Sequence, residues 1–259
     1  MMPAVDINCD MGESYGVYQM GDDAKVMPYI SSANVACGFH AGDPRIMRRT
    51  VELAKAHGVR IGAHPGFPDL AGFGRRNLEL TFEEVRTDVL YQLGALSAFA
   101  QDAQWPLQHV KPHGQLNNMA MNHPQYADAI VDAVYGFNPE LILISYGGLL
   151  MEAAIGRGLP VAYEVYADRE YQADGQLVSR RVPGAVIHDV KKIMERVMRM
   201  ITDQEIIAVT GERLPRKIDT ICIHGDTPGA DEIARRLSGF LQEHGITIAP
   251  LKDLSRGAN

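Results

Sequence analysis

The sequence predicts an α/β fold, a (β/α) barrel of seven or eight strands that forms a single domain over residues 1–259. Two observations lead to this prediction. Short β-branched apolar runs alternate with amphipathic helical segments, an order typical of parallel strands joined by helical crossovers. Ionisable residues directly follow several of these runs, where the carboxyl ends of parallel strands meet and α/β enzymes keep their chemistry. The histidines at these points are His40, His64, His113 and His224.

Eight apolar runs have the length and the β-branched content of strands. Most of them are separated by helical stretches, and no composition shift or low-complexity linker divides the chain. The predicted strands are residues 5–9, 34–37, 59–63, 107–111, 141–145, 161–166, 220–223 and 246–251.

Three predicted helices carry their own start or stop signals. The first lies between Asp43, a natural N-cap, and Gly58, which ends it. The second begins with the capping box formed by Thr81 and Glu84 and continues with apolar residues along one face. The third covers residues 227–245 and repeats this design near the C-terminus.

Period-two alternation places polar side chains on one face of the predicted strands. Asp6, Asn8 and Asp10 share a face in the first strand, an unusual load of carboxylate for a buried element. An open sheet with one wet face shows the same alternation, but the intervening helices are expected to cover both faces. A barrel with a polar mouth at its carboxyl end therefore fits better. Further inward-facing sets are His109, Lys111 and His113, then Glu164, Tyr166 and Asp168, then Cys222, His224 and Asp226.

Composition restricts the class of ligand. The chain has 25 Lys and Arg against 32 Asp and Glu, a net charge of -7, so no basic face is expected for nucleic acid or anionic lipid. No apolar run approaches the roughly 18 residues of a membrane span, and the first residues lack the pattern of a signal peptide. We expect a cytoplasmic enzyme acting on a small molecule, with its three cysteines buried and unpaired.

The longest glycine-rich loop, Pro65 to Asn77, ends on two arginines. Its glycines predict a segment that is mobile when empty and closes over substrate, with Arg75 pairing a substrate carboxylate or phosphate. An ordinary glycine-rich turn with solvated arginines is the equal alternative.

Several loop motifs carry a family resemblance. DINCDMGES, SANVACGFHAGDP, IGAHPGFPDLAGFGRR, HVKPHG, YADREYQADGQLVSR and CIHGDTPGA occur in this order. Over about residues 5–248 they resemble the LamB/YcsF family. Two segments depart from the family pattern, Glu13 to Gly16, where glycine more often follows the glutamate, and Gln115 to Asn118, where Ala-Leu-Tyr-Asn is usual.

The resemblance implies a distorted (β/α) barrel similar to the glycoside hydrolase/deacetylase fold and a role in bacterial ATP-dependent 5-oxoprolinase. That enzyme opens the lactam of 5-oxo-L-proline to L-glutamate while ATP is hydrolysed to ADP and phosphate. Its other components, subunits B and C, are the implied partners. The sequence contains no G-x-x-x-x-G-K-[ST] phosphate loop, so the site of the ATP cosubstrate is expected to lie partly or wholly in these partners.

Lactam hydrolysis would require particular chemical roles of the residues at the mouth of the predicted barrel. If the ring oxygen is phosphorylated, the attacking water needs a base, the tetrahedral centre needs a cation or N–H donors, and the leaving nitrogen needs a proton. Asp10, Lys111 and His113 are the catalytic candidates for these roles, in an order that the sequence leaves open. The candidates for substrate binding are Asn8, Glu13, Asn34, His40, His64, Arg75, Asp168 and His224.

A divalent metal is an open question at this stage. Asp10, His40 and His64 are the candidate ligands, a nitrogen and carboxylate set that suits zinc. No H-E-x-x-H pair accompanies them, and an ATP-driven lactamase does not require a metal. The other histidines have structural interpretations: a hydrogen-bonded core residue for His109, helix ends for His57 and His244, and solvated positions for His123 and His188.

Two other classes of function remain beside the lactamase. A free-standing, metal-dependent amide or polysaccharide deacetylase would use the same histidines, and a non-catalytic assembly subunit would hold the partners together. Fold analogy alone is weak support for the deacetylase function. Self-association into a homo-oligomer is also left open.

Overall fold

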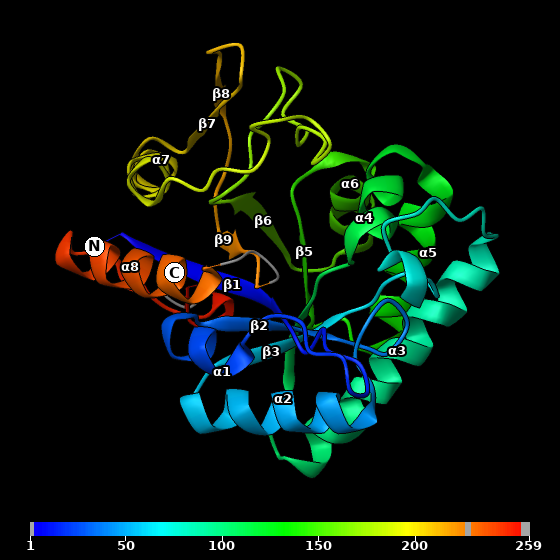
Figure 1. The fold of residues 1–259 in the computed structure, drawn as a ribbon. Helices are drawn as coiled ribbons and strands as arrows, with labels where there is room; N and C mark the ends of the chain where they lie inside the picture. Colours follow the sequence, from blue (N-terminus) through cyan, green and yellow to red (C-terminus); the bar gives the residue numbers. More distant parts are fainter. Residues whose placement is uncertain (1–2, 226–228, 255–259) are drawn as a thin grey trace.

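The computed structural model describes residues 3–225 and 229–254. Within these ranges, seven parallel strands pair side by side, and pairing between β1 and β9 closes them into a barrel (Figure 1). The barrel prediction is confirmed, with seven strands. In order around the barrel they are β1 (Ala4–Met11), β2 (Ser32–Ala36), β3 (Arg60–His64), β4 (Leu107–Val110), β5 (Ile142–Ser145), β6 (Val161–Tyr166) and β9 (Thr220–Ile223).

The last predicted strand is wrong over most of its length. Only β10 (Thr247–Ile248) is extended, and it pairs with β1 at Ala4 and Val5. The rest of this edge of β1 is occupied, because β9 pairs with residues 6–9. The chain then turns into α9 (Leu251–Leu254) instead of continuing the strand.

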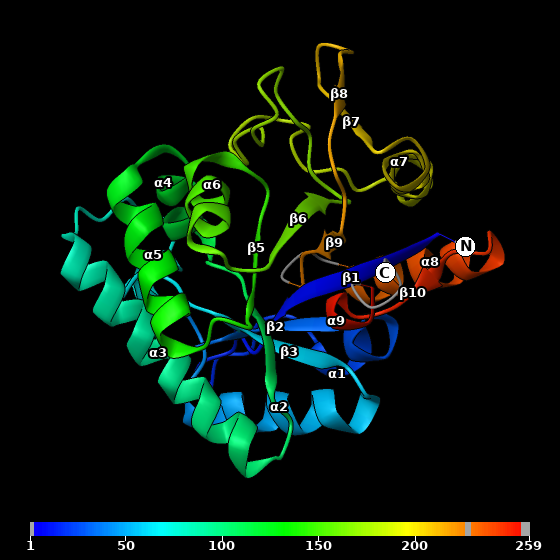
Figure 2. The same cartoon turned by 180° about the vertical axis from the view of Figure 1, so that it is seen from behind.

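Helices pack around the barrel, and Figure 2 shows them from behind. The predicted caps are confirmed: the Asp43 side chain accepts from the first turn of α2, Gly58 adopts φ 71°, and Thr81 forms the capping box of α3. Residues 227 and 228 of the third predicted helix lie outside the described residues. The main helices are α2 (Pro44–His57), α3 (Phe82–Asp102), α4 (Gly114–Asn122), α5 (Pro124–Phe137), α6 (Gly148–Arg157), α7 (Val190–Asp203) and α8 (Ala230–Glu243).

Smaller elements complete the part of the chain that the structure describes. An antiparallel pair, β7 (Glu205–Ile207) and β8 (Arg213–Pro215), was not predicted because each strand is too short to show a period. Together with α7 it projects away from the barrel between β6 and β9 (Figure 1). The remaining short elements are α1 (Asp23–Val26), η1 (Met27–Tyr29) and η2 (Leu70–Gly72). Among the described residues, no helix has both the length and the apolar character needed to cross a bilayer.

The barrel interior is polar and hydrogen-bonded. Asp6, fully buried, accepts hydrogen bonds from the hydroxyls of Ser31, Ser32 and Thr220. The hydroxyls come from the start of β2, from Ser31 just before it and from the start of β9, so this carboxylate has a structural role. Higher in the barrel, His109 Nε2 lies 2.7 Å from Asn34 Oδ1, in agreement with the prediction of a core histidine. The three cysteines are buried and unpaired, as expected.

Candidate active site

A lysine lies between two carboxylates at the mouth of the barrel. The Nζ atom of Lys111, just past β4, is 2.9 Å from Asp10 Oδ1 and 2.8 Å from Glu164 Oε1. Burial works against the ammonium, but the combined interactions with Asp10, Cys222 and Glu164 outweigh it and keep the pKa of Lys111 well above its usual range. Burial likewise favours the neutral acid at Asp10, yet His64 and Lys111 hold the pKa of Asp10 well below its usual range. The site therefore contains a charged lysine compensated by opposite charges.

The carboxyl ends of β1 to β4 bring together a set that we call the histidine cluster: Glu13, His40, His64 and His113. The rings of His40 and His113 stack with 3.7 Å between centroids, and His64 meets both edge-on. All four side chains are buried. Burial lowers the pKa of His40 and of His113 well below the usual value, so both rings are neutral near pH 7.

The loop from Pro65 to Asn77 packs directly on this cluster. A Cβ at Gly66 would lie 2.5 Å from His40 Nδ1, and a Cβ at Gly74 would lie 2.9 Å from His113 Cδ2. These two glycines are needed for close approach of the backbone to the rings.

Hydrogen bonds also anchor this loop. Gln92 of α3 accepts from the backbone N–H of Gly66 and donates to its carbonyl. Arg76 is paired with Asp69 inside the loop, so it is not directed at a ligand. Arg75 does line the cavity described below. These contacts favour an ordinary turn of fixed structure for residues 65–77 over a mobile loop that closes on substrate.

A histidine and an aspartate form a dyad on the opposite wall. His224 Nδ1 lies 2.9 Å from Asp168 Oδ1 and 3.1 Å from Oδ2. Because an ionised carboxylate only accepts, Nδ1 carries the hydrogen and Nε2 is left as the basic nitrogen. Burial would raise the pKa of Asp168, but His224 together with Arg180 and Arg169 outweighs it and the pKa is lowered. The Tyr166 ring stacks on His224 with 5.2 Å between centroids. Asp226, predicted to face the barrel interior together with His224, lies outside the described residues.

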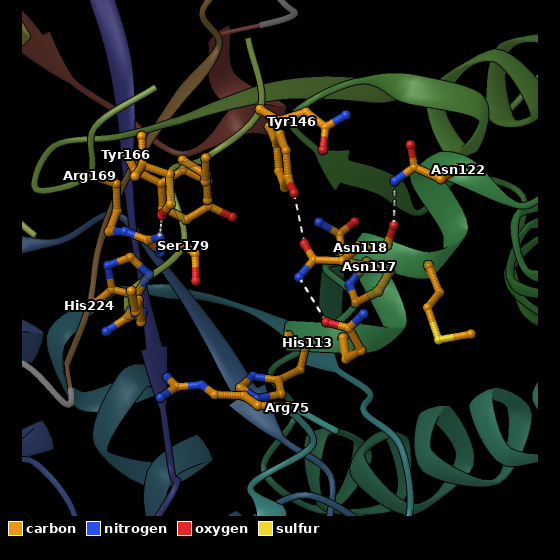
Figure 3. Close-up of a pocket in the computed structure, with 18 of the residues that line it drawn as sticks. Arg75, His113, Asn117, Asn118, Asn122, Tyr146, Tyr166, Arg169, Ser179 and His224 are labelled. Carbon is orange, nitrogen blue, oxygen red and sulfur yellow. Dashed lines mark hydrogen bonds between the residues drawn. The ribbon is translucent and has the colours of Figure 1, made fainter. Parts of the chain in front are cut away.

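A cavity of about 730 Å³ opens above these groups (Figure 3). It lies at the carboxyl end of the barrel, and its wall is largely polar, with four arginines among the lining residues. The volume is in the range of small-molecule sites. The lining residues include Arg75, Lys111, His113, Asn117, Tyr146, Tyr166, Arg169 and His224.

The predicted site residues fall into two groups, according to whether they line the cavity. Six of them line the cavity: Asp10, His64, Arg75, Lys111, His113 and His224. The other predicted substrate ligands, Asn8, Glu13, Asn34, His40 and Asp168, are not among the lining residues.

The two asparagines support the charged groups from below. Asn8 Oδ1 accepts from Lys111 Nζ at 3.2 Å, and Asn34 Nδ2 donates to Asp10 Oδ1 at 2.8 Å. Both side chains are fully buried.

Sequence reasoning missed several residues of the site. Glu164 was recognised as inward-facing but was not included, although a buried carboxylate on the same face as Tyr166 and Asp168 is a signal in itself. Asn117, Tyr146 and Arg169 come from α4 and from loops whose position depends on packing.

Two groups of side chains have the composition of metal ligands within the described residues. One is the histidine cluster, whose ligand atoms all lie within 4.8 Å of one another; the other comprises Asp10, Cys222 and His224. Of the predicted ligands, His40 and His64 fall in the first group and Asp10 in the second. Asp10 Oδ2 is nevertheless 3.5 Å from His64 Nε2.

Fold and site together define a class of protein, closed parallel (β/α) barrels with a cluster of buried ionisable side chains at the carboxyl end of the strands. A solved structure described as "T48 deacetylase with substrate" has a TM-score of 0.53 and 16% identity, covering 100% of this chain and 93% of that one. This likeness concerns the fold alone. The chain belongs to the LamB/YcsF family, whose model matches residues 5–256.

Individual relatives match over almost the whole chain. The 5-oxoprolinase A subunit of Pyrococcus abyssi is 51% identical over 96% of this chain and 98% of its own length. That of Rhodopseudomonas palustris strain BisB5 is 52% identical over 95% of this chain and 98% of its own. The lactam utilization protein from Thermus thermophilus has a TM-score of 0.90 and 46% identity, covering 95% of this chain and 99% of that structure.

Proposed function

We propose that this chain is the A subunit of 5-oxoprolinase and opens the lactam of 5-oxo-L-proline to L-glutamate in an ATP-hydrolysing enzyme. The observation that carries this is the 51% identity, over 96% of the chain, to a relative of that name. A five-membered lactam recloses readily because its amine stays close to the carbonyl. Hydrolysis of ATP to ADP and phosphate supplies the free energy that drives opening of the lactam ring.

Lys111 is proposed to stabilise charge on the lactam oxygen. Its ammonium lines the cavity and is fixed by Asp10 and Glu164, so it requires no reorganisation when negative charge develops. Asp10 is proposed both to orient Lys111 and to act on the attacking water.

Proton transfer is proposed for His113, as the sequence predicts, and also for His224. Asp168 holds His224 in the tautomer whose Nε2 accepts a proton, and His224 lines the cavity. That nitrogen can take a proton from water and return it to the leaving ring nitrogen. His113 is more constrained, since its Nε2 is committed to the carbonyl of Phe73 at 2.8 Å.

The anionic part of the substrate is proposed to bind the arginines of the cavity wall. Arg169 is 6% exposed and donates to the Val178 carbonyl, but its Nε is buried without a hydrogen-bond partner among the described residues. Arg75 enters the same cavity. A guanidinium recognises carboxylate or phosphate through paired donors.

Subunits B and C are the proposed partners, and they are proposed to supply part or all of the ATP site. The word "subunit" in the names of the relatives supports an assembly. Within this chain, the sequence lacks a glycine-rich phosphate loop of the G-x-x-x-x-G-K-[ST] type.

Reconstitution tests the proposal. The chain alone, subunits B and C alone, and the three together are incubated with 5-oxoproline and ATP, and glutamate and phosphate are measured. We expect glutamate only from the complete mixture, and none when ATP is left out. Glutamate formation by B and C without this chain would contradict the proposal.

A further inference from the structure

The tautomers of two histidines in the cluster follow from their hydrogen bonds. His64 Nδ1 lies 2.6 Å from the carbonyl oxygen of Lys111, and His113 Nε2 lies 2.8 Å from that of Phe73. A carbonyl only accepts, so each of these nitrogens carries a hydrogen. In the neutral rings, His64 Nε2 and His113 Nδ1 are therefore lone-pair nitrogens.

Those two lone-pair nitrogens face each other at 3.0 Å. Two acceptors at this distance repel unless a proton or a metal ion lies between them. Histidines that bind a metal commonly donate their other ring N–H to a backbone carbonyl, which fixes the ring and aims the free nitrogen at the ion. His64 and His113 both have this arrangement.

His40 adds a third nitrogen donor. It is 0% exposed, and neither ring nitrogen has a hydrogen-bond partner among the described residues. An unsatisfied buried polar group destabilises the folded protein, and Gly66 packs so closely that the ring has little room to turn away. Its Nε2 lies 3.6 Å from Glu13 Oε1, and that same oxygen lies 3.7 Å from His113 Nδ1. The carboxylate and the imidazoles thus converge on one point.

We propose that the histidine cluster binds one divalent transition-metal ion of the zinc class. The ligands would be Nε2 of His40 and His64, Nδ1 of His113 and a carboxylate oxygen of Glu13. Imidazole nitrogens with one carboxylate suit zinc and cobalt, whereas magnesium and calcium prefer oxygen ligands. An ion of this class acts as a Lewis acid. The proposal goes beyond the lactamase function and does not depend on it.

The second candidate group does not carry such a site. Lys111 Nζ already lies 2.9 Å from Asp10 Oδ1 and 3.2 Å from Cys222 Sγ, so a cation is in place there. A second cation on the same ligands would be repelled. The ligand set inferred from the structure thus keeps His40 and His64 of the sequence prediction and replaces Asp10 by Glu13 and His113.

Metal binding to the whole purified chain tests the proposal. After treatment with a chelator and its removal, the protein is titrated with Zn²⁺ by calorimetry and with Co²⁺ by visible absorption. We expect one ion per chain, cobalt d–d bands, and a thermal midpoint that rises with Zn²⁺ because the ion binds the native state. His40→Gln and Glu13→Gln should each weaken binding by a factor on the order of 100 or more, since even outer partners of a metal ligand contribute roughly 10–100-fold.

His109→Gln is the matched control, because His109 is a buried histidine of the same barrel that lies outside the cluster. It should still bind one ion. Near-ultraviolet circular dichroism checks each fold, and Glu13→Gln decides the matter if His40→Gln does not fold. No saturable binding by folded wild-type protein, or unchanged affinity in the folded cluster variants, would overturn the proposal. Failure of the lactamase function would appear separately, as a reconstituted complex that binds metal and forms no glutamate.

Discussion

Lys111, just past β4, and Glu164, within β6, form a buried ion pair with 2.8 Å between Nζ and Oε1, although the two strands are not adjacent in the barrel. Glu164 is 0% exposed, so water does not screen the attraction. Such a pair is costly to break, because the remaining charge is left buried. It holds Lys111 at a fixed place in the mouth.

Removing the ammonium tests the proposed role of Lys111. Lys111→Met keeps the length of the side chain, and turnover of the reconstituted enzyme should fall by a factor on the order of 100 or more if the charge stabilises the transition state. The protein should fold, with a lower thermal midpoint because Asp10 and Glu164 lose their partner. Lys25→Met, at an exposed lysine, is the control. Wild-type turnover in Lys111→Met would count against this assignment.

The dyad of His224 and Asp168 predicts a tautomer effect. Asp168→Asn retains a hydrogen bond to the ring but no longer dictates which nitrogen holds the hydrogen, so kcat should fall roughly 10²–10⁴-fold. The dependence of kcat/KM on pH should shift in the variant. His188→Gln, at an exposed histidine outside the cavity, should behave as wild type. An unchanged pH profile in Asp168→Asn would leave the dyad a structural contact.

The loop from Pro65 to Asn77 should be ordered before substrate binds. Its backbone is held by Gln92 at Gly66, and the Gly74 N–H donates to the Asp69 carbonyl. Hydrogen exchange at residues 65–77 should be slow in the free protein and change little with 5-oxoproline, whereas Gln92→Ala should accelerate it. Fast hydrogen exchange in the free protein that slows when 5-oxoproline binds would instead support a mobile loop that closes on substrate.

Two glycines should respond oppositely to alanine. At Gly62 in β3, a Cβ would lie 2.1 Å from His109 Cδ2, so Gly62→Ala should destabilise the protein by about 1–3 kcal/mol through overpacking. At Gly94, exposed within α3, nothing lies within 4 Å of an added Cβ. Gly94→Ala should therefore stabilise by roughly 0.5–1 kcal/mol through helix propensity. Urea unfolding of both variants measures the difference, and equal effects would refute the packing account.

Asp6 should make stability depend on pH. Burial raises its pKa from 3.8 to about 6 despite the hydroxyl donors. An acid whose pKa is raised in the folded state contributes stability that is fully present below 3.8 and is lost as the pH rises to about 6. The difference corresponds to roughly 3 kcal/mol. Asp6→Asn should remove this slope when the free energies of unfolding of variant and wild type are compared between about pH 4 and pH 7. The same pH dependence of the unfolding free energy in wild type and Asp6→Asn would contradict this assignment to Asp6.

Local patterns were sufficient for the seven barrel strands, the capped helices and the order of the histidines. Asp43, Gly58 and the capping box at Thr81 act within one turn of helix, so their effect can be read from neighbouring residues. The alternation of strands and helices is also a local pattern, so the barrel was predictable. The length of β10 was not, because it depends on how much of β1 is left free by β9.

The sequence by itself determined which ionisable residues reach the carboxyl end of the barrel, because strand period and chain order are local properties. Only the tertiary structure decided their partners. Closure of the barrel placed Glu164 against Lys111, and Asp168 against His224. It also grouped His40 and His64 with Glu13 and His113 rather than with Asp10. These distances depend on the packing of strands far apart in the chain, for which no short sequence window carries information.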